Sequence, residues 1–145
     1  MKFNHSTVNP EAYQTMLKFH QFTEGTAIEP KLRELIKIRV SQINGCAFCI
    51  DMHARDVRKH GESEQRIVLL NAWRETTLYS EAEKAALALA ECATVLSSHG
   101  VPDQVYEQVL EHFSEKEFVD LLMIINDINS WNRFGVSLHL QPEPR

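Results

Sequence analysis

Two thiols and an imidazole lie close together in the chain, at Cys46, Cys49 and His53. At about 100° per residue of an α-helix, Cys49 lies to one side of Cys46 and His53 falls between them in angle, so all three share one helix face. His53 is about 6 Å from Cys49 along the helix axis, against about 10 Å from Cys46. We therefore expect the imidazole to contact Cys49 directly.

The residues around the cysteine pair favour reactive thiols. Asn44-Gly45 predicts a turn between two helices directly before Cys46, so the Cys-x-x-Cys sequence lies at the start of a new helix. Free amides and the positive end of the helix dipole stabilise thiolates there, which lowers the pKa of the thiols. By this argument alone Cys46, nearer the helix start, is the more ionised thiol. The pattern predicts redox chemistry.

Composition limits the class of protein. The chain has 145 residues, of which 43% are hydrophobic, so we expect one domain, 1–145, that needs no disulfide for stability. Three cysteines and no apolar leader after Met1 favour a reducing, cytoplasmic compartment, where a close cysteine pair is catalytic or metal-binding. A net charge of −5 without a Lys/Arg cluster argues against nucleic acid. No apolar run approaches the ~20 residues that span a bilayer, so we expect no membrane partner.

The hydrophobic pattern is helical through most of the chain. Apolar residues recur at three- and four-residue steps, and no alternating strand pattern is found. We expect an all-α fold of about six to seven helices. They run from Pro10 to before Gly25, from Pro30 to Asn44, from Cys46 to about Lys59, from Ser63 to before Thr76, from Ser80 toward Ser97, from Asp103 to about His112, and from Ser114 onward.

The last helix carries a polar edge and two aromatic residues. Asn126, Asn129 and Asn132 form an edge that a monomer would leave in water, which we interpret as a subunit contact. Trp131 and Phe134 are assigned to the core or to an interface rather than to a substrate pocket. Residues 141–145 are expected to form a loose tail.

The remaining cysteine and histidines receive no role. Cys92, alone in a helix of small residues, is expected in the core. The other histidines show no ligand-like spacing and are assigned to the surface or the core: His5, His20, His60, His99, His112 and His139.

The chain resembles the AhpD-like branch of the carboxymuconolactone decarboxylase superfamily. Glu34, the pair Cys46 and Cys49, and His53 fall on the glutamate, Cys-x-x-Cys and histidine set of that family. The resemblance extends through Leu32, 38–49, 53–55, 69–74, 79–81 and 129–133.

The resemblance implies an activity and a role for each of these residues. It implies an all-helical subunit assembled into trimers or hexamers, with peroxidase activity on organic hydroperoxides in antioxidant defence. In the family scheme Cys49 attacks the peroxide and becomes a sulfenic acid, while Cys46 donates a proton and then resolves it as a disulfide. A dithiol or lipoyl-type protein must reopen that bond. No metal, flavin or haem is implied.

Two features bear on that scheme. Glu34, on the preceding helix, would orient His53 and favour its imidazolium, so the two form a proton relay. Phe48 stands where the best-described alkylhydroperoxidases have a second histidine, which makes a general disulfide oxidoreductase the main alternative. Exposure decides which sulfur the reducing partner attacks.

Three other interpretations of the cysteine pair differ from this scheme. Cys46, Cys49 and His53 are acceptable zinc ligands, but no fourth ligand follows at a suitable spacing, and three ligands on one helix converge poorly. Lactone decarboxylases of the superfamily lack the cysteine pair. A redox sensor would form one disulfide per subunit without turnover.

Overall fold

Nine α-helices and one 3-10 helix make up the computed structural model, which describes residues 1–145 and contains no strand. The all-α prediction is confirmed. The elements are α1 (His5–Val8), α2 (Pro10–Glu24), α3 (Pro30–Asn44), α4 (Ala47–Lys59), α5 (Glu64–Val68), the 3-10 helix η1 (Leu70–Glu75), α6 (Glu81–Thr94), α7 (Leu96–His99), α8 (Asp103–His112) and α9 (Glu115–Ser137).

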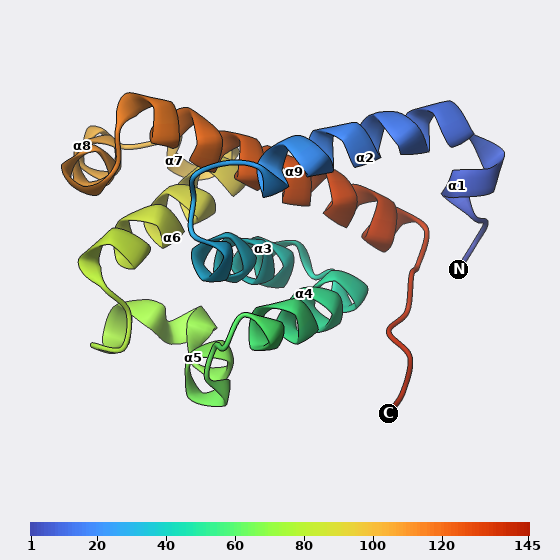
Figure 1. The fold of residues 1–145 in the computed structure, drawn as a ribbon, viewed down its shortest axis with the longest axis horizontal. Coiled ribbons are helices and arrows are strands. Elements are labelled where there is room, and N and C mark those ends of the chain that lie inside the picture. The colour runs from blue at the N-terminus through green and yellow to red at the C-terminus, as the bar shows by residue number, and fades with distance from the viewer.

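Helix α3 lies at the centre of the fold, between α4 and α9 (Figure 1). Its residues Ile36 and Val40 belong to one core cluster with α6, α9 and the cysteine pair. Its residues Leu35 and Ile38 belong to a second cluster with α4 and η1. Because both faces of α3 are covered, polar residues of this helix are also buried and need partners inside the protein. The second helix, α2, packs along the C-terminal helix α9 on the outer side.

The predicted helix starts are confirmed by their caps. The side chain of Asn9 accepts a hydrogen bond from the backbone of Ala12, and Pro10 follows at the first helical position. Ser80 and Glu83 form a complete capping box at the start of α6. Ser63 and Ser114 cap α5 and α9 by accepting hydrogen bonds from the backbone N–H groups of Arg66 and Glu117. These caps fix where the helices begin.

Two predicted helices are shorter than expected. The helix expected from Ser63 to before Thr76 ends at Val68, and η1 follows. Leu70 and Trp73 of η1 are both buried in the second core cluster, and a 3-10 helix aligns residues three apart on one face. The helix from Ser80 ends at Thr94, because Val95 leaves the helical conformation before the short helix α7. These breaks, together with α1, explain why the number of helices exceeds the prediction.

Both ends of the chain are tied to the body of the protein. Helix α1 was not predicted; Asn4 caps it by accepting from the backbone N–H of Ser6. The segment 141–145 has no regular structure, as expected, but the guanidinium of Arg145 donates to both carboxylate oxygens of Asp51, at 2.6 and 2.9 Å. The tail is therefore less loose than predicted. None of the helices has both the length and the apolar character of a transmembrane segment.

Candidate active site

A left-handed glycine separates α3 from α4 and places the first cysteine. Gly45 has φ 71° and ψ 32°, a conformation that costs little only for glycine. The turn lets the Cys46 N–H donate to the carbonyl of Ser41 at 3.0 Å. Helix α4 consequently begins at Ala47, and Cys46 is its N-cap rather than its first helical residue as predicted.

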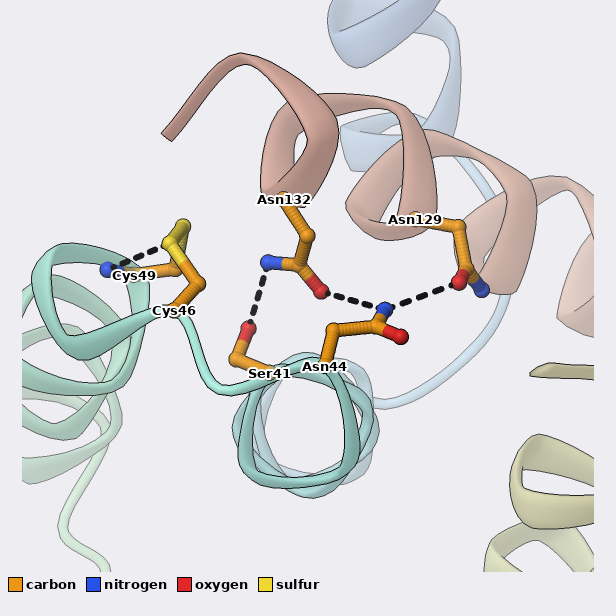
Figure 2. The surroundings of a disulfide bond; sticks show 6 residues. All are labelled: Ser41, Asn44, Cys46, Cys49, Asn129 and Asn132. Carbon is orange, nitrogen blue, oxygen red and sulfur yellow. Dashed lines mark hydrogen bonds between the residues drawn. A yellow bond between two sulfur atoms is a disulfide. The ribbon is translucent and has the colours of Figure 1, made fainter. Parts of the chain in front are cut away.

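Cys46 and Cys49 are joined by a disulfide with an S–S distance of 2.07 Å (Figure 2). The backbone N–H of Cys49 donates to Sγ of Cys46 at 3.3 Å. A helix-start amide aimed at this sulfur would stabilise negative charge on it in the reduced form, as the sequence argument expected for Cys46. Both residues are buried, at 2% and 3% exposure.

Two asparagines of α9 form hydrogen bonds with the end of α3, next to the turn that precedes Cys46. Asn132 donates to Oγ of Ser41 at 2.9 Å, and Asn44 donates to the side-chain oxygens of Asn132 and Asn129, each at 2.9 Å (Figure 2). Asn132 is 1% exposed, whereas Asn126 is exposed. The interpretation of this edge as a subunit contact was wrong for Asn132, and Asn129, which is partly buried, also bonds within the chain. Their partners lie on α3 and α6, which the sequence pattern alone does not bring together.

Helix α9 also approaches the disulfide through a glycine. A Cβ placed on Gly135 would lie 2.6 Å from Sγ of Cys46 and 3.2 Å from Sγ of Cys49. The first distance is well inside van der Waals contact. Gly135 therefore lets the backbone of α9 pack against the sulfurs where any side chain would collide.

Glu34 and His53 meet as the sequence predicted. Nδ1 of His53 lies 2.7 Å from Oε2 of Glu34, and both residues are buried. Burial would raise the pKa of Glu34, but the hydrogen bond from His53 and the ammonium of Lys37 outweigh it and lower this pKa from 4.5 to about 2. The carboxylate thus accepts the proton on Nδ1 and leaves Nε2 as the other ring nitrogen. The catalytic roles of the pair remain predictions.

Further charged side chains lie next to the pair of Glu34 and His53. Lys37, 1% exposed, places Nζ 3.3 Å from Glu34 and 2.7 Å from Glu24. Arg33 contacts the other oxygen of Glu24 at 2.8 Å. Two cations thus face two carboxylates beside the imidazole, and the exposed Glu24 helps to keep the buried charges of Arg33, Glu34 and Lys37 paired.

A cavity of about 640 Å³ lies next to the disulfide, and Cys49 and His53 both line it. Cys46 does not line it. Phe48 and Met52 line it with apolar side chains. Phe48 stands where alkylhydroperoxidases have a second histidine, so this position is apolar here. This volume is typical of sites for small organic molecules. Of the two sulfurs, the one that a ligand in the cavity would meet is that of Cys49.

Several residues that line the cavity were not assigned to it from the sequence. Trp131 and Phe134, which were expected in the core or at an interface rather than at a substrate pocket, line it. His5 and His20 line it too. One signal was available for His20, because it continues the helical face of Tyr13 and Leu17, which also face the cavity. The position of α1, and therefore of His5, had no such signal.

The third cysteine lies apart from this site. Cys92 on α6 is free and half-buried rather than part of the core as expected. Burial and the carboxylate of Glu91 raise the pKa of its thiol.

Cys46, Cys49 and His53, which were considered as zinc ligands and not favoured, do not form a metal centre in the oxidised protein, because the two cysteines are bonded to each other. Ligand atoms of Glu34, His53 and Asp56 do lie within 4.8 Å of one another. The ammonium of Lys37, 3.3 Å from Glu34, opposes a divalent cation there. The donor set therefore suits a hydrogen-bonded proton relay better than a metal ion.

Comparison with known proteins shows which family the chain is similar to. Residues 10–91 match the sequence model of the carboxymuconolactone decarboxylase family. An uncharacterized protein of Bacillus subtilis, YdfG, is 53% identical over 131 residues, which cover 90% of this chain and 89% of that protein. A shorter match, 47% identical over 34 residues, joins 23% of this chain to 19% of the alkyl hydroperoxide reductase AhpD of Hyphomonas neptunium.

A solved structure has nearly the same fold. It is a protein of unknown function from Agrobacterium tumefaciens, for which an AhpD-type role in antioxidant defence has been suggested. The TM-score is 0.97 at 37% identity, with 99% of each chain covered. The helical arrangement around the cysteine pair is therefore shared with a protein seen by crystallography.

Proposed function

The chain belongs to the carboxymuconolactone decarboxylase family, and we propose that it is a thiol-dependent peroxidase that reduces organic hydroperoxides through a Cys46/Cys49 dithiol–disulfide cycle. One observation carries the proposal. Cys49 is bonded to Cys46 and lines the same cavity as His53, whose Nδ1 is held by Glu34. An attacking sulfur, a resolving sulfur and a proton relay thus meet at one small-molecule cavity.

In the first step the thiolate of Cys49 attacks the terminal oxygen of the hydroperoxide. The S–O bond forms as the O–O bond breaks, and the sulfur gives up two electrons to become a sulfenic acid. The leaving alkoxide takes a proton from the thiol of Cys46, and the product is an alcohol. His53 and Glu34 relay protons to and from the two thiols through Nε2, because Nδ1 stays on the carboxylate.

In the second step Cys46 attacks the sulfur of the sulfenic acid. The S–S bond forms as the S–O bond breaks, and the leaving hydroxide takes a proton relayed by His53 and departs as water, which gives the disulfide that the structure contains. The two cysteines are spaced three residues apart at the start of α4, so the second thiol is in place before the sulfenic acid can oxidise further.

A dithiol or lipoyl-type protein completes the cycle. We propose that its thiolate attacks Cys49, because this is the sulfur at the cavity. Cys46 then leaves as a thiolate that the amide of Cys49 stabilises, and a lower thiol pKa makes a better leaving group. The second thiol of the reductant releases Cys49 and carries away two electrons as its own disulfide.

A general disulfide oxidoreductase is the second candidate, and Phe48 favours it. The family's additional histidine is missing between the cysteines, and His53 is the only histidine of α4. Under this alternative the same dithiol exchanges with protein disulfides and reacts only slowly with hydroperoxides.

We also propose that the protein acts as a cytoplasmic homo-oligomer, a trimer or a hexamer. The resemblance to AhpD-like proteins supports this assembly. Exposed apolar side chains on α6–α9 supply surface for it: Val95, Leu96, Tyr106, Val119 and Val136.

Turnover distinguishes the candidates. Purified protein is mixed with a large excess of cumene hydroperoxide and dihydrolipoamide, and peroxide loss is followed. A peroxidase consumes many equivalents per subunit, a sensor stops after one disulfide, and an oxidoreductase consumes little peroxide but rapidly reduces a disulfide substrate. The Cys92→Ser variant serves as the control, because its sulfur lies outside the site and turnover should be unchanged.

A further inference from the structure

A buried carboxylate with an unused oxygen lies on the wall of the same cavity. Asp127 of α9 is 1% exposed and lines the cavity with Cys49 and His53. Its Oδ2 is 2.9 Å from Nδ1 of His20 and 3.3 Å from the hydroxyl of Thr23. Its Oδ1 has no hydrogen-bond partner within the chain. A buried acceptor of this kind costs free energy unless a donor reaches it.

An imidazole that lines the same cavity also lacks hydrogen-bond partners. Both ring nitrogens of His5 are buried and without a hydrogen bond, and His5 lines the cavity. In its neutral form the ring offers one donor and one acceptor. The peroxidase mechanism uses neither His5 nor Asp127.

Aromatic rings surround these polar groups. His5 stacks on Phe134, with ring centroids 5.1 Å apart, and meets Tyr13 edge-on at 5.4 Å. Trp131 lies 6.1 Å from Tyr13 and follows Asp127 by one helical turn on α9. Flat apolar walls therefore stand next to the unpaired carboxylate oxygen.

We propose that Asp127, with His5, forms a subsite for a hydrogen-bond-donating group of the substrate, so that the preferred hydroperoxides carry a hydroxyl or amino group on a flat, apolar body. The donor binds Oδ1 of Asp127, and the body stacks between the rings while the peroxide faces Cys49. The inference rests on the proposed peroxidase function for its chemistry, but the subsite itself is a binding property. A ligand carboxylate offers only acceptors to Asp127 and is disfavoured.

Alcohols that mimic the reduced product test binding without chemistry. Four compounds are used: 2-phenyl-2-propanol with a methyl, hydroxymethyl, aminomethyl or carboxyl group in the para position. Their affinities for the oxidised protein are measured by calorimetry. The hydroxymethyl and aminomethyl compounds should bind at least about tenfold more tightly than the methyl compound, because a hydrogen bond to a charged group is worth that much. The carboxyl compound should bind most weakly.

Two variants on the same helix locate the effect. Asp127→Asn removes the charge and can offer an amide donor, so the preference for aminomethyl over carboxyl should fall at least about tenfold. Asp120→Asn is the matched control, since Asp120 is also buried on α9 but pairs with Lys116 and does not line the cavity. It should leave the preference unchanged.

The outcomes separate this inference from the proposed function. Equal binding of the methyl and hydroxymethyl compounds, no binding of any of the four, or equal shifts in both variants would overturn the subsite. The series on the unmodified protein decides the matter even if Asp127→Asn does not fold. If the protein binds the donor compounds selectively but does not turn over the matching hydroperoxides, the subsite is supported and the proposed peroxidase activity is contradicted.

Discussion

Gly135 of α9 lies directly against the sulfur of Cys46, so close that a Cβ on this glycine would be 2.6 Å from Sγ. The two residues are far apart in the sequence and belong to the last helix and to the cap of α4. The contact makes the C-terminal helix one wall of the redox site. It also explains why a glycine is accommodated inside a helix, where it ordinarily weakens the structure.

Replacing this glycine should destabilise the protein. Alanine at an ordinary helical position stabilises slightly, but Gly135→Ala forces the Cβ into Cys46 and should cost about 1–3 kcal/mol of unfolding free energy. Urea unfolding of the oxidised protein measures it. Gly25→Ala is the control, because its Cβ would meet nothing closer than 3.6 Å and its φ is −90°. Equal stability of Gly135→Ala and the wild type would contradict the close contact.

The Glu34 carboxylate should contribute stability in a defined pH range. Its pKa is lowered from 4.5 to about 2 in the folded protein, so the folded state favours the ionised form. This contribution, about 3 kcal/mol, is present above pH 4.5 and is lost as the pH falls toward 2. The stability difference between the wild type and Glu34→Gln should therefore narrow below pH 4.5. Denaturant unfolding across pH 2–7 measures it.

A second glutamate, at the N-cap of the same helix, provides the comparison. Glu29 is exposed, and its side chain makes no cap hydrogen bond at the start of α3. Glu29→Gln should leave both the pH profile and peroxide turnover near those of the wild type, whereas Glu34→Gln should lose at least about tenfold in turnover. A similar effect of both substitutions would mean that only net charge matters and that the pair with His53 has no special role.

Asn132 should matter for folding rather than for assembly. Asn132→Ala removes the hydrogen bonds to Ser41 and from Asn44, which should cost about 2 kcal/mol of unfolding free energy. Asn126→Ala, exposed on the same helix, should cost less than about 0.5 kcal/mol. Unfolding curves and sedimentation velocity are measured together. Should Asn132→Ala instead keep its stability and change the subunit number, the edge would be a subunit contact after all.

The sequence predicted those parts of the fold that local chemistry determines. Helix starts at Pro10, Ser80 and Ser114 depend on caps within four residues, so their position could be foreseen. The break at Val95 and the 3-10 helix at Leu70 depend on what each segment packs against, which no local pattern contains. The hydrophobic periodicity predicted which segments are helical but not exactly where each helix ends.

The candidate site likewise contains residues that local sequence predicted and residues that it did not. Cys46, Cys49 and His53 lie on one short segment, and their spacing alone indicated their chemistry. Glu34 required the resemblance, and the structure then placed it against His53. Asp127 and Gly135 are brought in by α9 from the far end of the chain. Their roles depend on tertiary contacts, so sequence reasoning could not find them.

Metal removal should leave the protein unchanged. The ammonium of Lys37 already pairs with Glu34, so a divalent cation would have to compete with a buried positive charge. Dialysis against a chelator should alter neither peroxide turnover nor the unfolding temperature, and elemental analysis should find less than one metal ion per subunit. A loss of activity that zinc restores would contradict this interpretation.

Trapping the oxidised sulfur tests the central claim most directly. Reduced wild type, Cys46→Ser, Cys49→Ser and Cys92→Ser are treated with one equivalent of cumene hydroperoxide and a sulfenic-acid probe, and the labelled residue is found by mass spectrometry. We predict a stable label on Cys49 in Cys46→Ser, none in Cys49→Ser, and an unlabelled Cys46–Cys49 disulfide in the wild type and in Cys92→Ser. A label on Cys46 in Cys49→Ser, with peroxide consumed at the wild-type rate, would contradict the account.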